Sequence, residues 1–150
     1  MKKSPVILVV EDNPGDVRLI KEALKTSSFN LNLYFVLDGV EALQFLETRK
    51  REPSNNFPQL IVLDLNLPRK SGFEVLQVVK RDERLKRIPV IVLSSSQNPE
   101  DIAKAYDLHA NCYLNKASNF EAYIDLVKAL EYFWIMMSPI PSTHATRLYS

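Results

Sequence analysis

The sequence predicts a doubly wound α/β fold, in which helices cover both faces of a five-stranded parallel sheet. Two observations predict it. Three short runs rich in β-branched residues, 6–10, 60–63 and 90–93, are apolar throughout, which is typical of strands buried on both faces in the middle of a parallel sheet. Segments with apolar residues at helical spacing separate these runs, as the crossovers between parallel strands require.

Two more strands have weaker signals. Residues 31–36 place Asn32 among apolar neighbours, and residues 111–114 begin with a polar residue. Mixed runs of this kind suit strands near the edge of a sheet. If the three most apolar strands are internal, the strand order is 2-1-3-4-5, which is that of the flavodoxin-like fold.

Each strand is followed by a segment whose apolar residues fall on one face of a helix, so five helices can each pack one stripe against the sheet. The last of these helices is long and continues to about residue 137. In chain order, the stripes are Val17, Ile20 and Leu24; Ala42, Leu43 and Leu46; Val75, Leu76 and Val79; Ile102, Ala105 and Tyr106; and Phe120, Ile124 and Val127.

Start signals precede four of these helices. Two combine an asparagine cap with a proline at the first helical position, and two match the capping box, in which a serine and a glutamate bond each other's backbone. They are Asn13-Pro14, Asn98-Pro99, Ser71 with Glu74, and Ser118 with Glu121.

The composition suits a single domain. The chain has 150 residues, of which 46% are apolar, enough for one buried core. A net charge of +1 gives no reason to expect binding to nucleic acid or to a membrane.

The first apolar run is too short to cross a membrane and has no cleavage site after it, so we expect a cytoplasmic protein. The lone Cys112 cannot form an internal disulfide and is expected to be a buried structural thiol. We expect residues 1–137 to form the domain and 138–150 to be an extension.

Polar side chains follow four of the strands at the point where each strand ends. Glu11 and Asp12 follow the first strand, Asp64 the third, Ser94 the fourth and Lys116 the fifth. The carboxyl ends of parallel strands share one edge of the sheet, and ligands of such folds bind there. We therefore expect these side chains to meet at one site.

Three carboxylates at one site repel one another. At an effective dielectric of about 20, two unit charges about 4 Å apart interact by roughly 4 kcal/mol. Lys116 can offset one charge, and a divalent cation can offset the rest. Carboxylate oxygens with a backbone carbonyl, here that of Asn66, suit magnesium, so the sequence predicts a magnesium site.

This cluster has a natural reaction. Asp64 can attack phosphorus as a nucleophile and form an acyl phosphate, while the cation, Lys116 and a hydrogen bond from Ser94 stabilise the transferred oxygens. Taken singly, the residues have structural alternatives, because Glu11 and Asp12 can cap a helix, Asp64 can cap a loop, and Lys116 can be a solvated charge. Their joint placement at four strand ends favours the chemical interpretation.

Three other classes of protein fit the sequence less well. A haloacid-dehalogenase-type phosphatase also forms an aspartyl phosphate, but it needs a second acid two residues after the nucleophile, where this chain has Asn66. A flavin or nucleotide domain needs a phosphate-binding loop after the first strand, where Glu11 and Asp12 would repel phosphate. A binding module that works without phosphate would not need the acids.

Five segments together resemble the response-regulator receiver domain: 9–13, 38–43, 64–68 with Gly72, 89–94 and 113–116. The resemblance runs from about residue 6 to residue 130. It implies that a partner histidine kinase phosphorylates Asp64. It also implies that the chain's own reactions are limited to magnesium-dependent self-phosphorylation and self-dephosphorylation, so we expect a signalling protein and not an enzyme. It also implies magnesium bound by Asp12, Asp64 and the Asn66 carbonyl, with Glu11 acting mainly through water.

The resemblance extends to a switch pair. Ser94 takes the hydroxyl position and Tyr113 the aromatic one, which implies that Ser94 moves toward the phosphoryl group and Tyr113 rotates into the vacated space. Alternatively, Tyr113 is simply an aromatic of an edge strand. One position departs from the family pattern, because Ala117 stands where proline is usual; we expect no cis peptide there, since its cost for a non-proline residue is about 3 kcal/mol. The Glu11-Asp12 pair and residues 106–113 are most similar to single-domain regulators paired with cyanobacterial phytochromes.

The last helix ends in a run of large apolar and aromatic residues, 132–137. They cannot all face one core, and residues of these types are favoured at interfaces. We expect a homodimer formed through the fourth helix, the fifth strand and the fifth helix, although a tail folded over its own domain is an alternative. The residues expected at the interface are Tyr132, Phe133, Trp134 and Met136.

Overall fold

The computed structural model describes residues 6–27, 31–52, 57–116 and 120–137, with side chains as far as residue 132. In this part of the chain, strands and helices alternate: β1 (Val6–Val10), α1 (Pro14–Leu24), β2 (Asn32–Val36), α2 (Gly39–Lys50), β3 (Leu60–Leu63), α3 (Gly72–Arg81), β4 (Val90–Ser94), α4 (Pro99–Asp107), β5 (Cys112–Asn115) and α5 (Glu121–Met137). All strand pairs are parallel, in the order β2-β1-β3-β4-β5. The predicted flavodoxin-like fold is confirmed.

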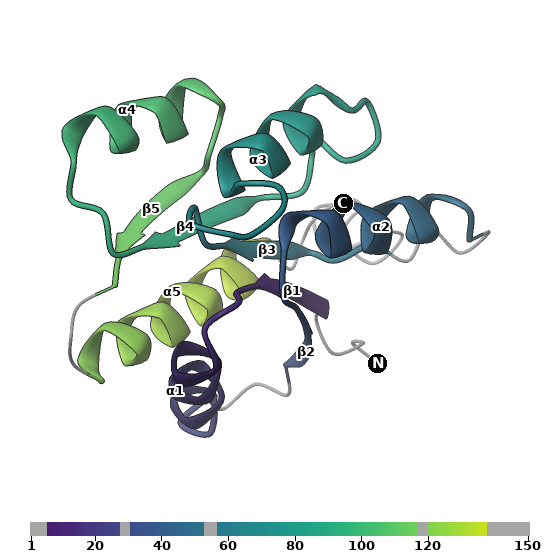
Figure 1. The fold of residues 1–150 in the computed structure, drawn as a ribbon. Helices are drawn as coiled ribbons and strands as arrows, with labels where there is room; N and C mark the ends of the chain where they lie inside the picture. The colour runs from purple at the N-terminus through teal and green to yellow at the C-terminus, as the bar shows by residue number, and fades with distance from the viewer. Residues whose placement is uncertain (1–5, 28–30, 53–56, 117–119, 138–150) are drawn as a thin grey trace.

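The sheet separates two layers of helices, with α1 and α5 on one face and α2, α3 and α4 on the other (Figure 1). Each face buries its own apolar cluster, because successive side chains of a strand point to opposite faces. In β1, Ile7 and Val9 join the cluster with α1 and α5, while Leu8 and Val10 join the other. The three internal strands are apolar throughout because they contribute to both clusters.

The asparagine caps and the first capping box are confirmed. The side chains of Asn13 and Asn98 accept hydrogen bonds from backbone N–H groups at the starts of α1 and α4, and Ser71 and Glu74 form the reciprocal box at α3. The second box includes Ser118, which lies outside the described residues, as do the peptide at Ala117 and the predicted extension 138–150.

Two residues expected on core-facing stripes are exposed instead. Tyr106 of α4 is 47% exposed because its hydroxyl leaves the core side and accepts a hydrogen bond from the backbone N–H of Tyr113, 3.1 Å away at the edge of the sheet. Phe120 is 42% exposed and precedes α5. Strand bounds differ by one residue from those expected: β2 begins at Asn32, and β4 and β5 end at Ser94 and Asn115.

The loop after β3 is held tightly against its neighbours. A Cβ at Gly72 would lie 2.2 Å from the Asp64 carbonyl oxygen, and a Cβ at Gly39 would lie 2.3 Å from that of Lys70, so both close approaches require glycine. The buried Asp38 caps α2 and also accepts from Arg69 Nε at 2.8 Å. These contacts fix the segment that follows Asp64.

No helix in the described ranges combines the length and apolar character needed to span a membrane. Cys112 is a half-buried free thiol on β5, and burial raises its pKa, as expected for a structural cysteine.

Candidate functional site

The alternation of side chains along the strands places Glu11, Asp64 and Lys116 on the side of α1 and α5. Ile7 and Val9 of β1 face that side, and the next residue in the same phase is Glu11. Asp64 continues the phase of Leu60 and Val62 in β3, and Lys116 continues that of Cys112 and Leu114 in β5. Three separate strands therefore deliver these side chains to one place, as predicted.

Lys116 lies at the centre of this group. Its Nζ is 2.7 Å from Glu11 Oε2, 2.9 Å from Asp16 Oδ2 and 3.4 Å from Asp64 Oδ2. Glu11 and Asp64 are buried, and the Lys116 side chain is 10% exposed. Ion pairs shielded from water in this way are screened far less than those at the surface.

The charges alter one another's protonation. Burial raises the pKa of Glu11 to about 7; the hydrogen bond from Lys116 opposes this rise, and the neighbouring charge of Asp64 adds to it. Burial alone would lower the pKa of Lys116, but the hydrogen bonds to Glu11 and Asp16 and the charge of Asp64 raise it above its usual value. Lys116 is therefore held in its charged form, and Glu11 retains its proton to a higher pH than an ordinary glutamate does.

Glu11, Asp12 and Asp64 each offer a carboxylate oxygen, and these oxygens lie within 4.8 Å of one another. Asp12 is exposed, so the group opens to solvent. Asn66, the predicted carbonyl ligand, follows directly in the loop, and its N–H donates to Asp64 Oδ1 at 3.3 Å. A set of hard oxygens with one open side fits Mg²⁺, which retains water and prefers a phosphate oxygen as a further ligand.

Ser94 and Tyr113 lie on the opposite phase of their strands, toward α4. Ser94 is fully buried, and its Oγ accepts from the Ser96 N–H at 3.1 Å. The Tyr113 hydroxyl donates to the Ser96 carbonyl at 2.8 Å, and Ser96 Oγ donates to Asp101 at 2.6 Å. Both predicted switch residues therefore contact the same short loop between β4 and α4.

No sequence motif singles out two members of the site, Asp16 and Tyr123. Asp16 is an acid in the first turn of α1, where acids are common because they interact with the helix dipole, and Tyr123 lies within α5 without a motif around it. In the structure Asp16 binds Lys116, and the Tyr123 hydroxyl donates to Asp16 Oδ1 at 2.8 Å. The available signal was an aspartate in a first turn that already has an asparagine cap.

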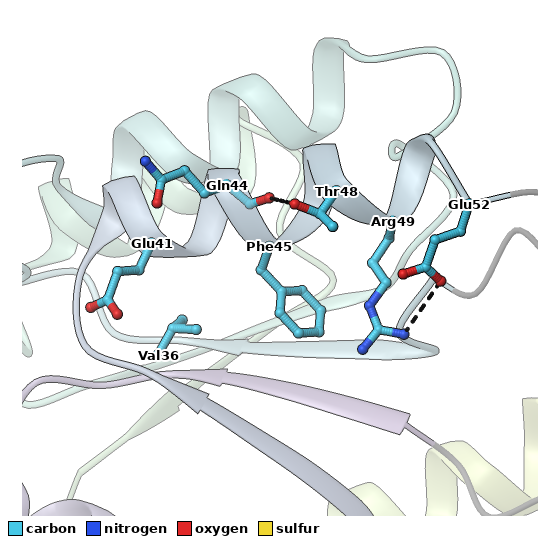
Figure 2. Close-up of a pocket in the computed structure, with 7 residues that line it drawn as sticks. All are labelled: Val36, Glu41, Gln44, Phe45, Thr48, Arg49 and Glu52. Carbon is cyan, nitrogen blue, oxygen red and sulfur yellow. Dashed lines mark hydrogen bonds and ion pairs between the residues drawn. The ribbon is translucent and has the colours of Figure 1, made fainter.

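A hollow of about 370 Å³ lies elsewhere, beside α2 at the end of β2 (Figure 2). Its lining includes Phe45 and Arg49, whose guanidinium lies 4.7 Å from the ring centroid of Phe45. None of the lining residues belongs to the acidic group. This hollow has no chemistry comparable with that of the rim.

Comparisons with known proteins agree with this geometry. The family model of the response regulator receiver domain matches residues 7–128. Response regulator Rcp1 of Synechocystis sp. is 44% identical over 137 residues, covering 91% of this chain and 93% of its own length. The probable methanogenesis regulatory protein FilR2 of Methanothrix harundinacea is 37% identical over 130 residues, covering 87% of this chain and 83% of its own length.

Solved structures give the same result. The phosphorylated cyanobacterial phytochrome response regulator RcpA superposes with a TM-score of 0.80 at 46% identity, over 93% of this chain and 100% of that chain. The Mn²⁺-bound form of Rcp1 gives a TM-score of 0.76 at 45% identity, over 87% of this chain and 94% of that chain. The chain belongs to the response regulator receiver domain family.

Proposed function

We propose that this receiver domain accepts a phosphoryl group on Asp64 and signals through the resulting change in its binding surface. The observation that carries the proposal is the joint position of Asp64, Lys116 and the acid pair Glu11-Asp12 at one rim. A nucleophilic carboxylate, a permanent cation and oxygen ligands for a divalent ion are the parts that phosphoryl transfer requires.

In the proposed step, an Asp64 oxygen forms a bond with phosphorus while the bond from phosphorus to the donor breaks, and the leaving group takes the electron pair. Lys116 contacts an oxygen of the transferred group from the position it holds near Asp64 Oδ2. Asp12, Asp64 and the Asn66 carbonyl would hold Mg²⁺, with Glu11 acting mainly through water. The ion, when bound, neutralises negative charge on the phosphoryl oxygens.

Ser94 and Tyr113 are the proposed switch. The Ser94 hydroxyl would turn toward the phosphoryl group, and the loop carrying Ser96 would follow because Ser96 N–H is bound to Ser94 Oγ. Tyr113 is bound to the carbonyl of the same loop, so its ring would move with it. The surface formed by α4, β5 and α5 would then change, which is how a local event can bias a two-state element.

The partner proposed as donor is a sensor histidine kinase of the phytochrome type, because RcpA is described as a phytochrome response regulator. We also propose a homodimer through α4, β5 and α5. Tyr132 on α5 is 64% exposed, as an interface residue of a separated protomer would be. Phe133, Trp134 and Met136, the other predicted interface residues, have side chains outside the described part of the chain.

The test is the mass of the intact protein after incubation with acetyl phosphate and Mg²⁺. We expect a gain of one phosphoryl group that requires the cation. Asp64→Asn should abolish the gain, while the matched control Asp107→Asn, at an exposed position near the end of α4, should retain it. Turnover of phosphate esters without a stable mass gain would instead indicate a phosphatase, and an unchanged mass would contradict the proposal.

A further inference from the structure

The Asp16 carboxylate is held at both of its oxygens by residues distant in sequence. Oδ2 accepts from Lys116 Nζ at 2.9 Å, and Oδ1 accepts from the Tyr123 hydroxyl at 2.8 Å. Tyr123 is 2% exposed, so its ring is fixed in the core between α1 and α5. An acid anchored at both ends in this way has little freedom to move.

This carboxylate is not used to cap its own helix. Asp16 is the third residue of α1, the position from which an acid can bind back to the backbone N–H of the capping residue. That N–H, of Asn13, donates instead to Glu11 Oε1 at 3.1 Å. The Asp16 side chain is directed at Lys116 and Tyr123, and it is not part of the carboxylate group suited to a divalent ion.

Lys116 gains a defined direction from this contact. An ammonium has three hydrogens to donate, and its two shortest contacts are Glu11 at 2.7 Å and Asp16 at 2.9 Å, with Asp64 at 3.4 Å. Two donors engaged by fixed acceptors leave the third directed at Asp64. A lysine side chain loses rotamer entropy when it is fixed, so a residue that fixes it in advance lowers the barrier of a reaction that needs the ammonium in place.

We propose that Asp16 and Tyr123 are positioning residues for phosphoryl transfer: Tyr123 fixes Asp16, and Asp16 holds the Lys116 ammonium where it meets the phosphoryl group on Asp64. The inference rests on the proposed function of Asp64. Neither residue touches the reacting atoms, so each acts only through Lys116.

The experiment measures the rate of phosphorylation by acetyl phosphate at saturating Mg²⁺, in the full chain, at a temperature well below unfolding. Asp16→Asn removes the charge but keeps an acceptor, and we expect a loss of about tenfold, the size of one charge-assisted hydrogen bond. Tyr123→Phe removes only the hydroxyl that fixes Asp16, and we expect a loss of about threefold. The matched controls are Glu22→Gln, on an exposed part of α1, and Tyr34→Phe, on the edge strand β2.

The double variant, Asp16→Asn with Tyr123→Phe, distinguishes a role in positioning Lys116 from a purely structural contact between α1 and α5. If Tyr123 acts only through Asp16, the double variant should be about as slow as Asp16→Asn alone, and the dissociation constant for Mg²⁺ should be unchanged. Single variants that melt earlier but react at the wild-type rate would overturn the inference. Tyr123→Phe keeps the buried ring, so it carries the test even where Asp16→Asn does not fold. If the wild type itself gains no phosphoryl group, the proposed function of Asp64 fails. If the wild type is phosphorylated but the variants react equally fast, only the positioning role fails.

Discussion

The two sides of the rim are built from different kinds of bond. On the side of α1 and α5, Lys116 contacts three carboxylates, at 2.7, 2.9 and 3.4 Å. On the side of α4, the loop between β4 and α4 has one bond to a carboxylate, from Ser96 Oγ to Asp101. Its other bonds join neutral groups, such as the Tyr113 hydroxyl donating to the Ser96 carbonyl and the Ser96 N–H donating to Ser94 Oγ. The pleat of β4 and β5 separates the two sets, since successive residues face opposite sides.

The difference indicates that the two sides have different functions. Charge-assisted hydrogen bonds are roughly twice as strong as neutral ones, so the charged side is suited to hold groups in fixed positions. A neutral hydrogen bond contributes only about 1 kcal/mol, so the side of α4 can exchange its bonds at small cost. We therefore expect phosphoryl transfer to occur on the charged side. We expect the neutral side to change conformation afterwards and to be the surface that a partner binds.

The strongest test of the charged side replaces its central cation. Lys116→Met should slow phosphorylation by acetyl phosphate by about 10²–10³-fold, the usual cost of removing one group that stabilises developing charge. The matched control is Lys50→Met at the end of α2, where Lys50 pairs with Glu47 and Asp82. That variant should react at the wild-type rate. If both variants lost phosphorylation rate equally, the effect could not be assigned to the position of Lys116 in the charged group.

A divalent ion should stabilise the charged side selectively. Mg²⁺ at about 100 times its dissociation constant should raise the free energy of unfolding by about 2.7 kcal/mol, since it relieves repulsion among Glu11, Asp12 and Asp64. The melting temperature with and without Mg²⁺ measures this. Asp12→Asn should weaken the response, whereas Asp107→Asn should leave it intact; an equal response in both variants would place the ion elsewhere.

On the neutral side, removing one hydroxyl should have a small effect. Tyr113→Phe deletes the bond to the Ser96 carbonyl and should lower the free energy of unfolding by about 1 kcal/mol, as measured by urea denaturation. Phosphorylation should stay within about twofold of the wild-type rate, because the hydroxyl donates to the loop between β4 and α4 and does not contact the charged group. A loss as large as that of Lys116→Met would contradict the division between the two sides.

Asp38, which holds the loop after Asp64 through Arg69, should make the stability of the protein depend on pH. The N–H of Glu41 and then the Arg69 guanidinium hold the pKa of Asp38 below its usual value of 3.8. A carboxyl with a lowered folded-state pKa adds stability above its unfolded value and loses it as the pH falls through the folded value. At pH 7, wild type should therefore be more stable than Asp38→Asn, and the difference should shrink below about pH 4. A difference independent of pH would exclude the charge as its cause.

The smallest expected effect is a gain in stability next to α4. His109 follows α4 with a φ of 72°, a left-handed conformation that costs a side chain about 1 kcal/mol or more. Glycine removes that cost but loses about 0.5 kcal/mol through its freedom in the unfolded chain. His109→Gly should therefore raise the free energy of unfolding by about 0.5 kcal/mol, measured by urea denaturation. A decrease would indicate a contact of the imidazole that the backbone does not explain.

Most of the fold could be predicted because its signals are local. Apolar β-branched runs mark the internal strands, and Asn13, Asn98 and Ser71 mark helix starts through bonds within one turn. The placement of Asp64 and Lys116 also followed, because parallel strands end at a common edge.

Two missed contacts, both made by Asp16, join residues far apart in the sequence. Asp16 and Lys116 are 100 residues apart, and an aspartate in the first turn of a helix is common for its interaction with the helix dipole. Only the packing of α1 against α5 shows where its carboxylate goes. The exposure of Tyr106 has a different cause. Helical periodicity predicts a core position for it, but periodicity cannot anticipate that the N–H of Tyr113, only seven residues later, donates to its hydroxyl at the sheet edge.

If the proposed function is right, a phosphoryl group is transferred from a donor to one particular carboxylate of the rim, that of Asp64. Acyl phosphates are reduced by borohydride, which converts a phosphorylated aspartate into homoserine, so peptide mass spectrometry after phosphorylation and reduction identifies the residue. We expect homoserine at position 64 only in samples that contained Mg²⁺. Modification at Asp12 or Asp16 instead, or none at position 64 when the ion and donor are present, would contradict it.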